Sequence, residues 1–157
     1  MKEYTVSLFG HRIIENWDSV EFYLGKIVRK LAEQYECLLF LMGRDGDFDR
    51  IAASVIHKLI KCLSCDISIT WVMAYQRAEY TKNVFEFEEY YSSVEICCEA
   101  SLAHPKAAIQ IRNRSMVDRS DLVVFWVEKK AGGAYRTMSY ARKKEIPFIN
   151  LAEKQSL

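Results

Sequence analysis

The segment IRNRSMVDRSDLVVFWVEKKAGGAY spans residues 111–135 and passes through three different patterns. It begins in a helical pattern that carries three arginines and an asparagine. It then enters an apolar run at residues 121–127, which is typical of a buried strand. Gly132 and Gly133 follow this run and open another helical pattern. Helix, buried strand and helix in succession indicate a parallel sheet that is covered by helices.

The same alternation continues on both sides of this segment. The apolar patterns predict strands at residues 4–9, 37–42, 66–75, 121–127 and 147–151. They predict helices at residues 17–35, 107–118 and 133–144, and another whose apolar stripe covers residues 52–63. Crossovers between parallel strands are nearly always right-handed. We therefore predict an α/β fold, a doubly wound, mainly parallel five-stranded sheet with helices on both faces (Rossmann-like), as a single domain over residues 1–157.

Residues 76–103 lack a clean period and are rich in aromatic residues and glutamates. Segments of this length without regular structure are often functional flaps. We expect a short helix mixed with irregular chain here, which forms a lid or an insertion.

The composition limits the classes of function. The chain has 22 Lys and Arg against 21 Asp and Glu, for a formal net charge of +1. No global field therefore drives the protein onto nucleic acid or an anionic membrane, and an anion must be bound by a local cluster. The longest apolar runs fall well short of the roughly 20 residues that span a bilayer, and the N-terminal residues do not resemble a secretory signal. We expect a cytoplasmic protein without membrane contact.

Five cysteines, an odd number, indicate reduced thiols rather than a disulfide framework. Cys62 and Cys65 form a single C-x-x-C, whereas a structural zinc site usually uses two such pairs. Core packing is the favoured interpretation of these thiols. We expect no metal site and no cofactor.

The distinctive residues follow the predicted strands, at the edge of the sheet where open parallel sheets bind ligands. A Gly-His-Arg triplet follows the first strand, a run from Gly43 to Asp49 follows the second, and a Gly-Gly-Ala triplet comes after the fourth. Glycine turns that lead into helices bring backbone N–H groups close to an anion, which suits a phosphate. The candidate ligand-binding residues are Gly10, His11, Arg12, Gly43, Arg44, Gly46, Asp49, Arg112, Asn113, Arg114, Gly132, Gly133, Ala134 and Thr137.

The helix predicted at residues 107–118 also indicates which way its side chains face. Its spacing predicts that Met116 and Val117 face the sheet, which leaves Arg112 and Asn113 at the border of the cleft. A guanidinium binds phosphate through a fixed fork, and an asparagine both donates and accepts hydrogen bonds to a base or a ribose.

Each motif also has a local interpretation. The Gly-Gly pair is compatible with a simple tight turn. Asp47 fits an N-cap, with Asp49 adding charge to the first helical turn, and His11 fits a local hydrogen-bonding role. The arginine-rich helix would then be a solvated face, on which Arg114 and Asp118 form a modest ion pair. The functional hypothesis depends on all of these motifs reaching one edge of one sheet.

Taken together, four motifs resemble the SLOG superfamily of Rossmann-like proteins, which includes the lonely-guy (LOG) cytokinin-activating enzymes and the Smf/DprA domain. The motifs are G-H-R at residues 10–12, G-x-x-G-x-F-D at 43–49, R-N-R-x-M-V-D at 112–118, and G-G-A-Y at 132–135 with Thr137. They are most similar to the YpsA-like branch found in Firmicutes and their mobile elements, and the resemblance covers almost the whole chain. It implies a pocket for a nucleotide or a nucleotide-derived ligand.

The lonely-guy enzymes are phosphoribohydrolases, which split a nucleoside monophosphate into a free base and ribose 5-phosphate. The resemblance matches their Arg-Lys-x-x-Met helix to Arg112 and Met116, but it places Ser139 at the position of their catalytic glutamate. Cleavage of an N-glycosidic bond usually needs a carboxylate, which stabilises oxocarbenium-like charge or activates water. The candidate catalytic residues for such a reaction are Asp49, Asp118 and Arg112.

Three functions are therefore under consideration. The main hypothesis is binding of a small phosphorylated nucleotide or nucleotide derivative, by a sensor or a processing protein. The first alternative is phosphoribohydrolase-like cleavage of a nucleotide, with an aspartate replacing the glutamate. The second alternative is single-stranded nucleic-acid binding, which the near-zero net charge argues against, so we do not expect nucleic acid as a partner. A homo-oligomer is expected, because relatives of this type pair through helices.

Overall fold

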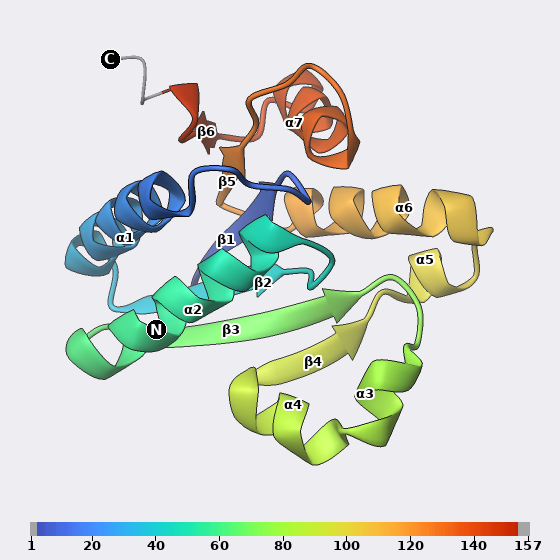
Figure 1. Cartoon of the computed structure of the whole chain (residues 1–157), viewed down its shortest axis with the longest axis horizontal. Coiled ribbons are helices and arrows are strands. Elements are labelled where there is room, and N and C mark those ends of the chain that lie inside the picture. The colour runs from blue at the N-terminus through green and yellow to red at the C-terminus, as the bar shows by residue number, and fades with distance from the viewer. Residues whose placement is uncertain (1–2, 154–157) are drawn as a thin grey trace.

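The computed structural model describes residues 3–153, which form one sheet with helices on both sides (Figure 1). The strands are β1 (Tyr4–Gly10), β2 (Cys37–Met42), β3 (Asp66–Met73), β4 (Ser93–Ile96), β5 (Leu122–Trp126) and β6 (Phe148–Asn150). The helices are α1 (Trp17–Gln34), α2 (Asp47–Cys62), α3 (Ala78–Lys82), α4 (Val84–Tyr90), α5 (Cys98–Ser101), α6 (Pro105–Asp118) and α7 (Gly133–Lys143). None of these helices is long and apolar enough to cross a membrane.

The sheet is doubly wound, as the alternating pattern predicts. Successive strand side chains point to opposite faces, so Val6 and Leu8 pack with α1 and α2, whereas Phe9 packs with α6 and α7. Met116 and Val117 lie in this second layer, which confirms the predicted inward face of α6. Because both faces are covered, the strands β2 (CLLFLM) and β5 (LVVFW) are continuous apolar runs rather than alternating ones.

The strand order is β4-β3-β2-β1-β5-β6, and every pair of neighbours is parallel. The chain moves outward from β1 to β4 and then crosses back to place β5 on the other side of β1. The direction of winding therefore changes between β1 and β5. In open parallel sheets a crevice forms at the carboxyl ends of the strands at this position.

The sequence predicts five strands, and the structure has a sixth within residues 3–153. The additional strand is β4, whose register with β3 runs from Thr70↔Ser93 to Met73↔Ile96. It escapes detection because it has only four residues, SVEI, two of which are polar or charged. Because it is an edge strand, its side chains do not have to be apolar on both faces of the sheet. The Ser93 hydroxyl instead shares a hydrogen bond of 2.7 Å with the Thr70 hydroxyl.

The remainder of the segment 76–103 forms α3, α4 and α5. Trp71 of β3 is fully buried and holds α3 and α4 in place. Its ring centre lies 5.9 Å from Tyr80, 5.0 Å from Phe87 and 5.5 Å from Tyr91. The aromatic residues that obscure the period of this segment are thus its anchor to the sheet.

Candidate nucleic-acid interface

A cleft of about 520 Å³ opens at the carboxyl ends of β1, β2 and β5. Most of the predicted ligand-binding residues line it, namely Gly10, His11, Arg12, Gly43, Gly46, Asp49, Arg112, Asn113, Gly132, Gly133 and Ala134. They come from loops that are far apart in the chain, and the parallel sheet brings these loops to one edge. The lining also includes residues that the sequence analysis did not select, namely Phe9, Asp45, Lys106, Ile109, Gln110 and Arg136.

The positions of two of these additional residues, Lys106 and Arg136, can be recognised in the sequence. Lys106 follows Pro105 at the first turn of α6, and Arg136 lies in the first turn of α7. Both helices begin at the carboxyl edge of the sheet, because a crossover helix runs antiparallel to its strands. Cations in the first turn of such helices therefore point to the same edge as the glycine turns.

Three predicted residues lie outside the cleft lining. Arg44 extends toward α3 and α4, where its Nη1 donates to the Tyr91 hydroxyl at 3.2 Å. Arg114 is exposed, with its guanidinium 5.4 Å from the centre of the Tyr140 ring. Thr137 is fully buried under the first turn of α7 and donates to the Gly133 carbonyl at 2.9 Å. The sequence motifs thus placed the backbone of these three residues near the cleft, but they did not predict where the side chains point.

The loops after β1 and β2 form a single unit. The Asp47 N–H donates to the Arg12 carbonyl at 2.8 Å, and the Asp47 carboxylate accepts from the Ile14 N–H at 3.0 Å. Asp47 is therefore not the N-cap of α2, as its sequence context suggested. That position belongs to Gly46, which has no side chain to form a cap.

Packing explains why two of the cleft positions are glycine. A Cβ at Gly10 would lie 2.2 Å from Cγ of Phe48, and a Cβ at Gly46 would lie 2.5 Å from Cα of Arg12. No rearrangement of a flexible side-chain end would relieve either overlap. Gly132 differs, because its φ of +93° is a backbone conformation that favours glycine.

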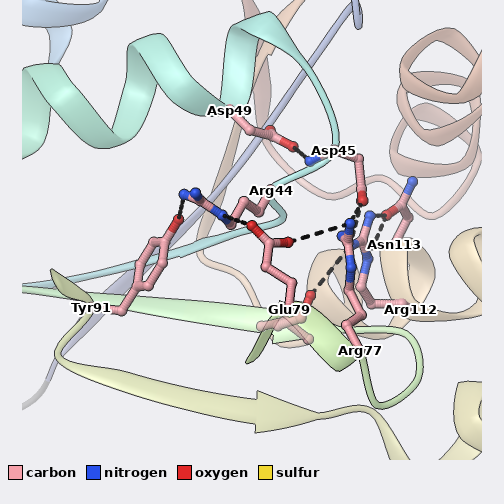
Figure 2. Close-up of polar contacts among 9 residues, drawn as sticks. Arg44, Asp45, Asp49, Arg77, Glu79, Tyr91, Arg112 and Asn113 are labelled. Carbon is pink, nitrogen blue, oxygen red and sulfur yellow. Dashed lines mark hydrogen bonds and ion pairs between the residues drawn. The ribbon is translucent and has the colours of Figure 1, made fainter. Parts of the chain in front are cut away.

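Arg112 is buried beneath the cleft and most of its donors are engaged (Figure 2). Its Nε and Nη2 donate to Oδ1 of Asn113 at 3.1 and 2.9 Å. Its Nη1 donates to Oδ2 of Asp45 and to the Val72 carbonyl, each at 3.2 Å. Four of the five guanidinium N–H bonds are used in this way. Arg112 and Asn113 border the cleft as expected, but they mainly connect α6 to the neighbouring loop and strand.

Asp45 joins two arginines from different elements (Figure 2). Its carboxylate lies 3.2 Å from Nη1 of Arg112 and 2.6 Å from Nη1 of Arg77. Arg77 in turn contacts Glu79 at 3.6 Å, and Glu79 contacts Arg44 at 3.3 Å. This chain of ion pairs links the loop after β2 to the start of α3.

Asp49 is the second carboxylate of the cleft, and Figure 2 shows it beside the backbone of Asp45. Its Oδ2 accepts the Asp45 N–H at 3.0 Å. The side chain is partly exposed to the cleft, but the surrounding protein removes most of its hydration, and this desolvation raises its pKa to about 6. The hydrogen bond from Asp45 and the charge of Arg112 favour the ionised form and oppose the increase.

His11 orders the loop that follows β5. Its Nε2 accepts the N–H groups of Glu128 at 2.8 Å and Lys129 at 3.2 Å, so this nitrogen carries no proton. Desolvation lowers the pKa of His11, which agrees with this neutral state. The geometry fits the local hydrogen-bonding role more closely than a catalytic one.

Asp118 and Ser139 lie away from the cleft lining. The Asp118 carboxylate is exposed and accepts the Tyr140 hydroxyl at 2.7 Å. The tyrosine therefore occupies the space in which an Arg114–Asp118 ion pair was expected, and no such pair forms among the described residues. Ser139 supplies no carboxylate, so the acidic residues at the described cleft are Asp45 and Asp49.

A side groove of about 340 Å³ adjoins the cleft. The two hollows share Arg12, Asp45 and Ile109. The groove adds Arg44, Arg50, Tyr75 and Arg77 to the cationic and aromatic side chains of this edge, so the predicted residue Arg44 lies here rather than in the cleft. Among the described residues, no three His, Cys, Asp or Glu side chains are grouped so that they could hold a metal ion.

The fold and this edge define a Rossmann-like α/β protein with a cationic cleft at the switch in strand order. No protein-family model and no curated protein sequence matches the chain. Solved structures that share its fold include two DNA processing proteins. One is DNA processing protein A from Helicobacter pylori, in a study of its single-stranded DNA binding mode, with 16% identity and a TM-score of 0.61. The other is DNA processing protein A (DprA) from Streptococcus pneumoniae, with 14% identity and a TM-score of 0.66.

Both matches cover 92% of this chain, but they cover only 63% of the Helicobacter chain and 49% of the Streptococcus chain. At these identities the likeness establishes the shared Rossmann-like fold and not a shared activity. The expected Rossmann-like fold is confirmed.

The comparison contradicts two expectations from the sequence. A protein of this fold binds single-stranded DNA, which overturns the preference for a small phosphorylated nucleotide and the exclusion of nucleic acid as a partner. The exclusion relied on the net charge of +1, which is a sum over the whole surface. The structure gathers Arg12, Lys106 and Arg136 at one cleft, so the local charge differs from the total.

Proposed function

We propose that this protein binds single-stranded DNA along the cleft and the side groove. The observation that carries the proposal is a set of exposed cations at this edge that form no ion pair within residues 3–153. Arg12, Lys106 and Arg136 line the cleft, and Arg50 lines the groove. Such cations are available to neutralise phosphates, which supply most of the affinity for nucleic acid.

The shape of the edge supports a strand rather than a single phosphate. Because the cleft and the groove meet at Arg12 and Asp45, the cations follow a path along several loops. The Gly132–Gly133 turn opens α7 at one part of this path, where backbone N–H groups and the helix dipole favour an anion. Tyr75 lines the groove with 43% of its surface exposed, and an exposed ring of this kind is suited to stack on an unpaired base.

We also propose that the protein belongs to the YpsA-like branch of the SLOG superfamily. The four motifs at the strand ends support the YpsA-like branch of the superfamily, and the fold of the solved structures agrees with the superfamily as a whole. The homo-oligomeric state remains a prediction from the same resemblance.

A charge-removal experiment tests the function. We expect the triple variant Arg12→Ala, Lys106→Ala and Arg136→Ala to bind a fluorescent oligo-dT more weakly than the wild type in fluorescence anisotropy. Each phosphate contact to a single strand contributes about 0.7 to the slope of log K against log salt. Loss of three contacts should therefore reduce that slope by about 2.

The control removes the same charge elsewhere. Lys30, Lys61 and Lys143 are exposed near the C-terminal ends of α1, α2 and α7, at the opposite edge of the sheet. Their triple alanine variant should keep the wild-type affinity and slope. An equal loss in both variants would contradict the cleft as the interface. Tighter binding to a duplex or to oligo-U than to oligo-dT would contradict single-stranded DNA as the partner.

A further inference from the structure

We propose that the cleft distinguishes the bases of the bound strand and that Asp49 selects guanine. This inference rests on the proposed single-stranded DNA binding and adds a specificity to it. It is based on a hydrogen-bond acceptor in the cleft, Oδ1 of Asp49, that accepts no hydrogen bond from the described residues.

One oxygen of the Asp49 carboxylate is open to the cleft. Its Oδ2 accepts the Asp45 N–H at 3.0 Å, whereas its Oδ1 accepts no hydrogen bond from the described residues. Within residues 3–153, every fully enclosed side-chain nitrogen or oxygen has a partner. Oδ1 is therefore accessible, and Asp49 is one of the residues that line the cleft.

Charges on three elements face this carboxylate. Arg112 from α6 and Arg12 from the loop after β1 favour its ionised form, whereas Asp45 from the loop after β2 opposes it. Tyr91 is the remaining titratable group that interacts with Asp49, and its pKa is raised mainly by burial, so it is neutral. With its pKa at about 6, Asp49 is ionised above that pH and then acts only as an acceptor.

The edges of the four bases differ in how they meet such a group. Guanine presents two adjacent donors, N1–H and the N2 amino group, and the open Oδ1 can accept from both through its two lone pairs. Its neighbouring O6 is an acceptor that an exposed guanidinium such as Arg12 can reach. Adenine and cytosine place an acceptor nitrogen beside their amino group, and thymine places its single N–H between two carbonyls. An ionised carboxylate beside an arginine therefore favours guanine.

This edge of guanine is occupied by base pairing in a duplex, so the selection requires an unpaired base. The test measures the dissociation constants of oligo-dT strands that carry guanine, adenine, cytosine or thymine at one central position, at pH 7.5 and at pH 5. A good bidentate contact discriminates between bases by about 5-fold to 150-fold. We expect the guanine strand to bind more tightly by a factor in this range at pH 7.5.

The preference should weaken at pH 5, because most of Asp49 is then protonated, and it should disappear at pH 7.5 in Asp49→Asn. Asp118→Asn removes the same charge outside the cleft and should keep the preference. The pH comparison uses the wild type, so the test does not depend on the folding of a variant. Equal affinities for all four strands would overturn this inference alone, whereas no binding to any strand would overturn the proposed function. A preference that survives in folded Asp49→Asn would assign the selection to another residue.

Discussion

The Asp49 carboxylate lies in a largely desolvated part of the molecule. Its pKa is about 6 in the folded protein, compared with an ordinary value of 3.8. The folded state therefore binds this proton more tightly than the unfolded chain does. The resulting contribution to stability is complete below the unfolded pKa and is lost as the pH rises through about 6. At neutral pH the ionised group opposes folding, as is common for groups retained for binding.

The variant Asp49→Asn should therefore be more stable than the wild type at pH 8. A shift of about two pKa units corresponds to at most about 3 kcal/mol, and the amide oxygen can still accept the Asp45 N–H. The difference should shrink as the pH falls from 8 to 4, because the wild-type side chain becomes protonated in the folded state and begins to be protonated in the unfolded chain. Urea unfolding at several pH values measures it, with Asp118→Asn as the control. A variant that is less stable than the wild type at pH 8 would show that Asp49 supports the fold.

At the scale of elements, α3 and α4 depend on a few aromatic contacts. Neither helix contains a fully buried residue. Phe87 provides much of the attachment, with its ring centre 5.0 Å from that of Trp71 and the Arg44 guanidinium 4.9 Å above it. Phe85 lies two residues away on the same helix and is 72% exposed. A comparison of Phe87 with Phe85 therefore distinguishes the loss of a packed ring from the loss of an exposed ring.

We expect Phe87→Ala to destabilise the protein by about 2 kcal/mol, below the usual cost of a fully buried phenylalanine. Phe85→Ala should change the free energy of unfolding by less than about 0.5 kcal/mol. Amide hydrogen exchange should accelerate in residues 78–91 of the Phe87 variant and remain slow in β1 and β2. If exchange accelerates equally throughout the sheet, these helices are not a separate unit.

At the scale of the whole molecule, Arg112 connects both sides of the binding edge. It joins α6 to the loop after β2 through Asp45 and to β3 through the Val72 carbonyl. The Asn113 amide continues the connection to Thr137 of α7 at 3.0 Å. A planar guanidinium reaches these acceptors at the same time, whereas a lysine ammonium on its flexible stem cannot.

Arg112→Lys should accordingly lower the free energy of unfolding by about 2 to 3 kcal/mol, because buried acceptors lose their donors. Arg114→Lys is the matched control on the same helix, and its exposed side chain predicts a change of less than about 0.5 kcal/mol. Chemical denaturation of both variants measures the difference. Wild-type stability of Arg112→Lys would mean that this guanidinium is not structural.

The sequence predicts the order of the main elements and the edge at which the site lies. Long apolar runs such as those of β2 and β5 need only their own residues to be recognised, and parallel pairing then places their loops together. β4 is missing from the prediction because four residues with mixed polarity carry no periodic signal. The cations Lys106 and Arg136 are missing because their signal, a position in the first turn of a helix, is weaker than that of the glycine turns.

The periodicity of hydrophobic residues determined the sheet, its winding and the approximate position of the cleft, because these depend on local patterns that a single chain displays. Only the tertiary structure decided which polar groups remain available to a ligand. Arg112 is engaged by Asp45, which lies 67 residues earlier in the chain, whereas Arg12 and Lys106 form no ion pair among the described residues. The direction of a side chain depends on the neighbours that folding brings to it, and residue type alone does not specify those neighbours.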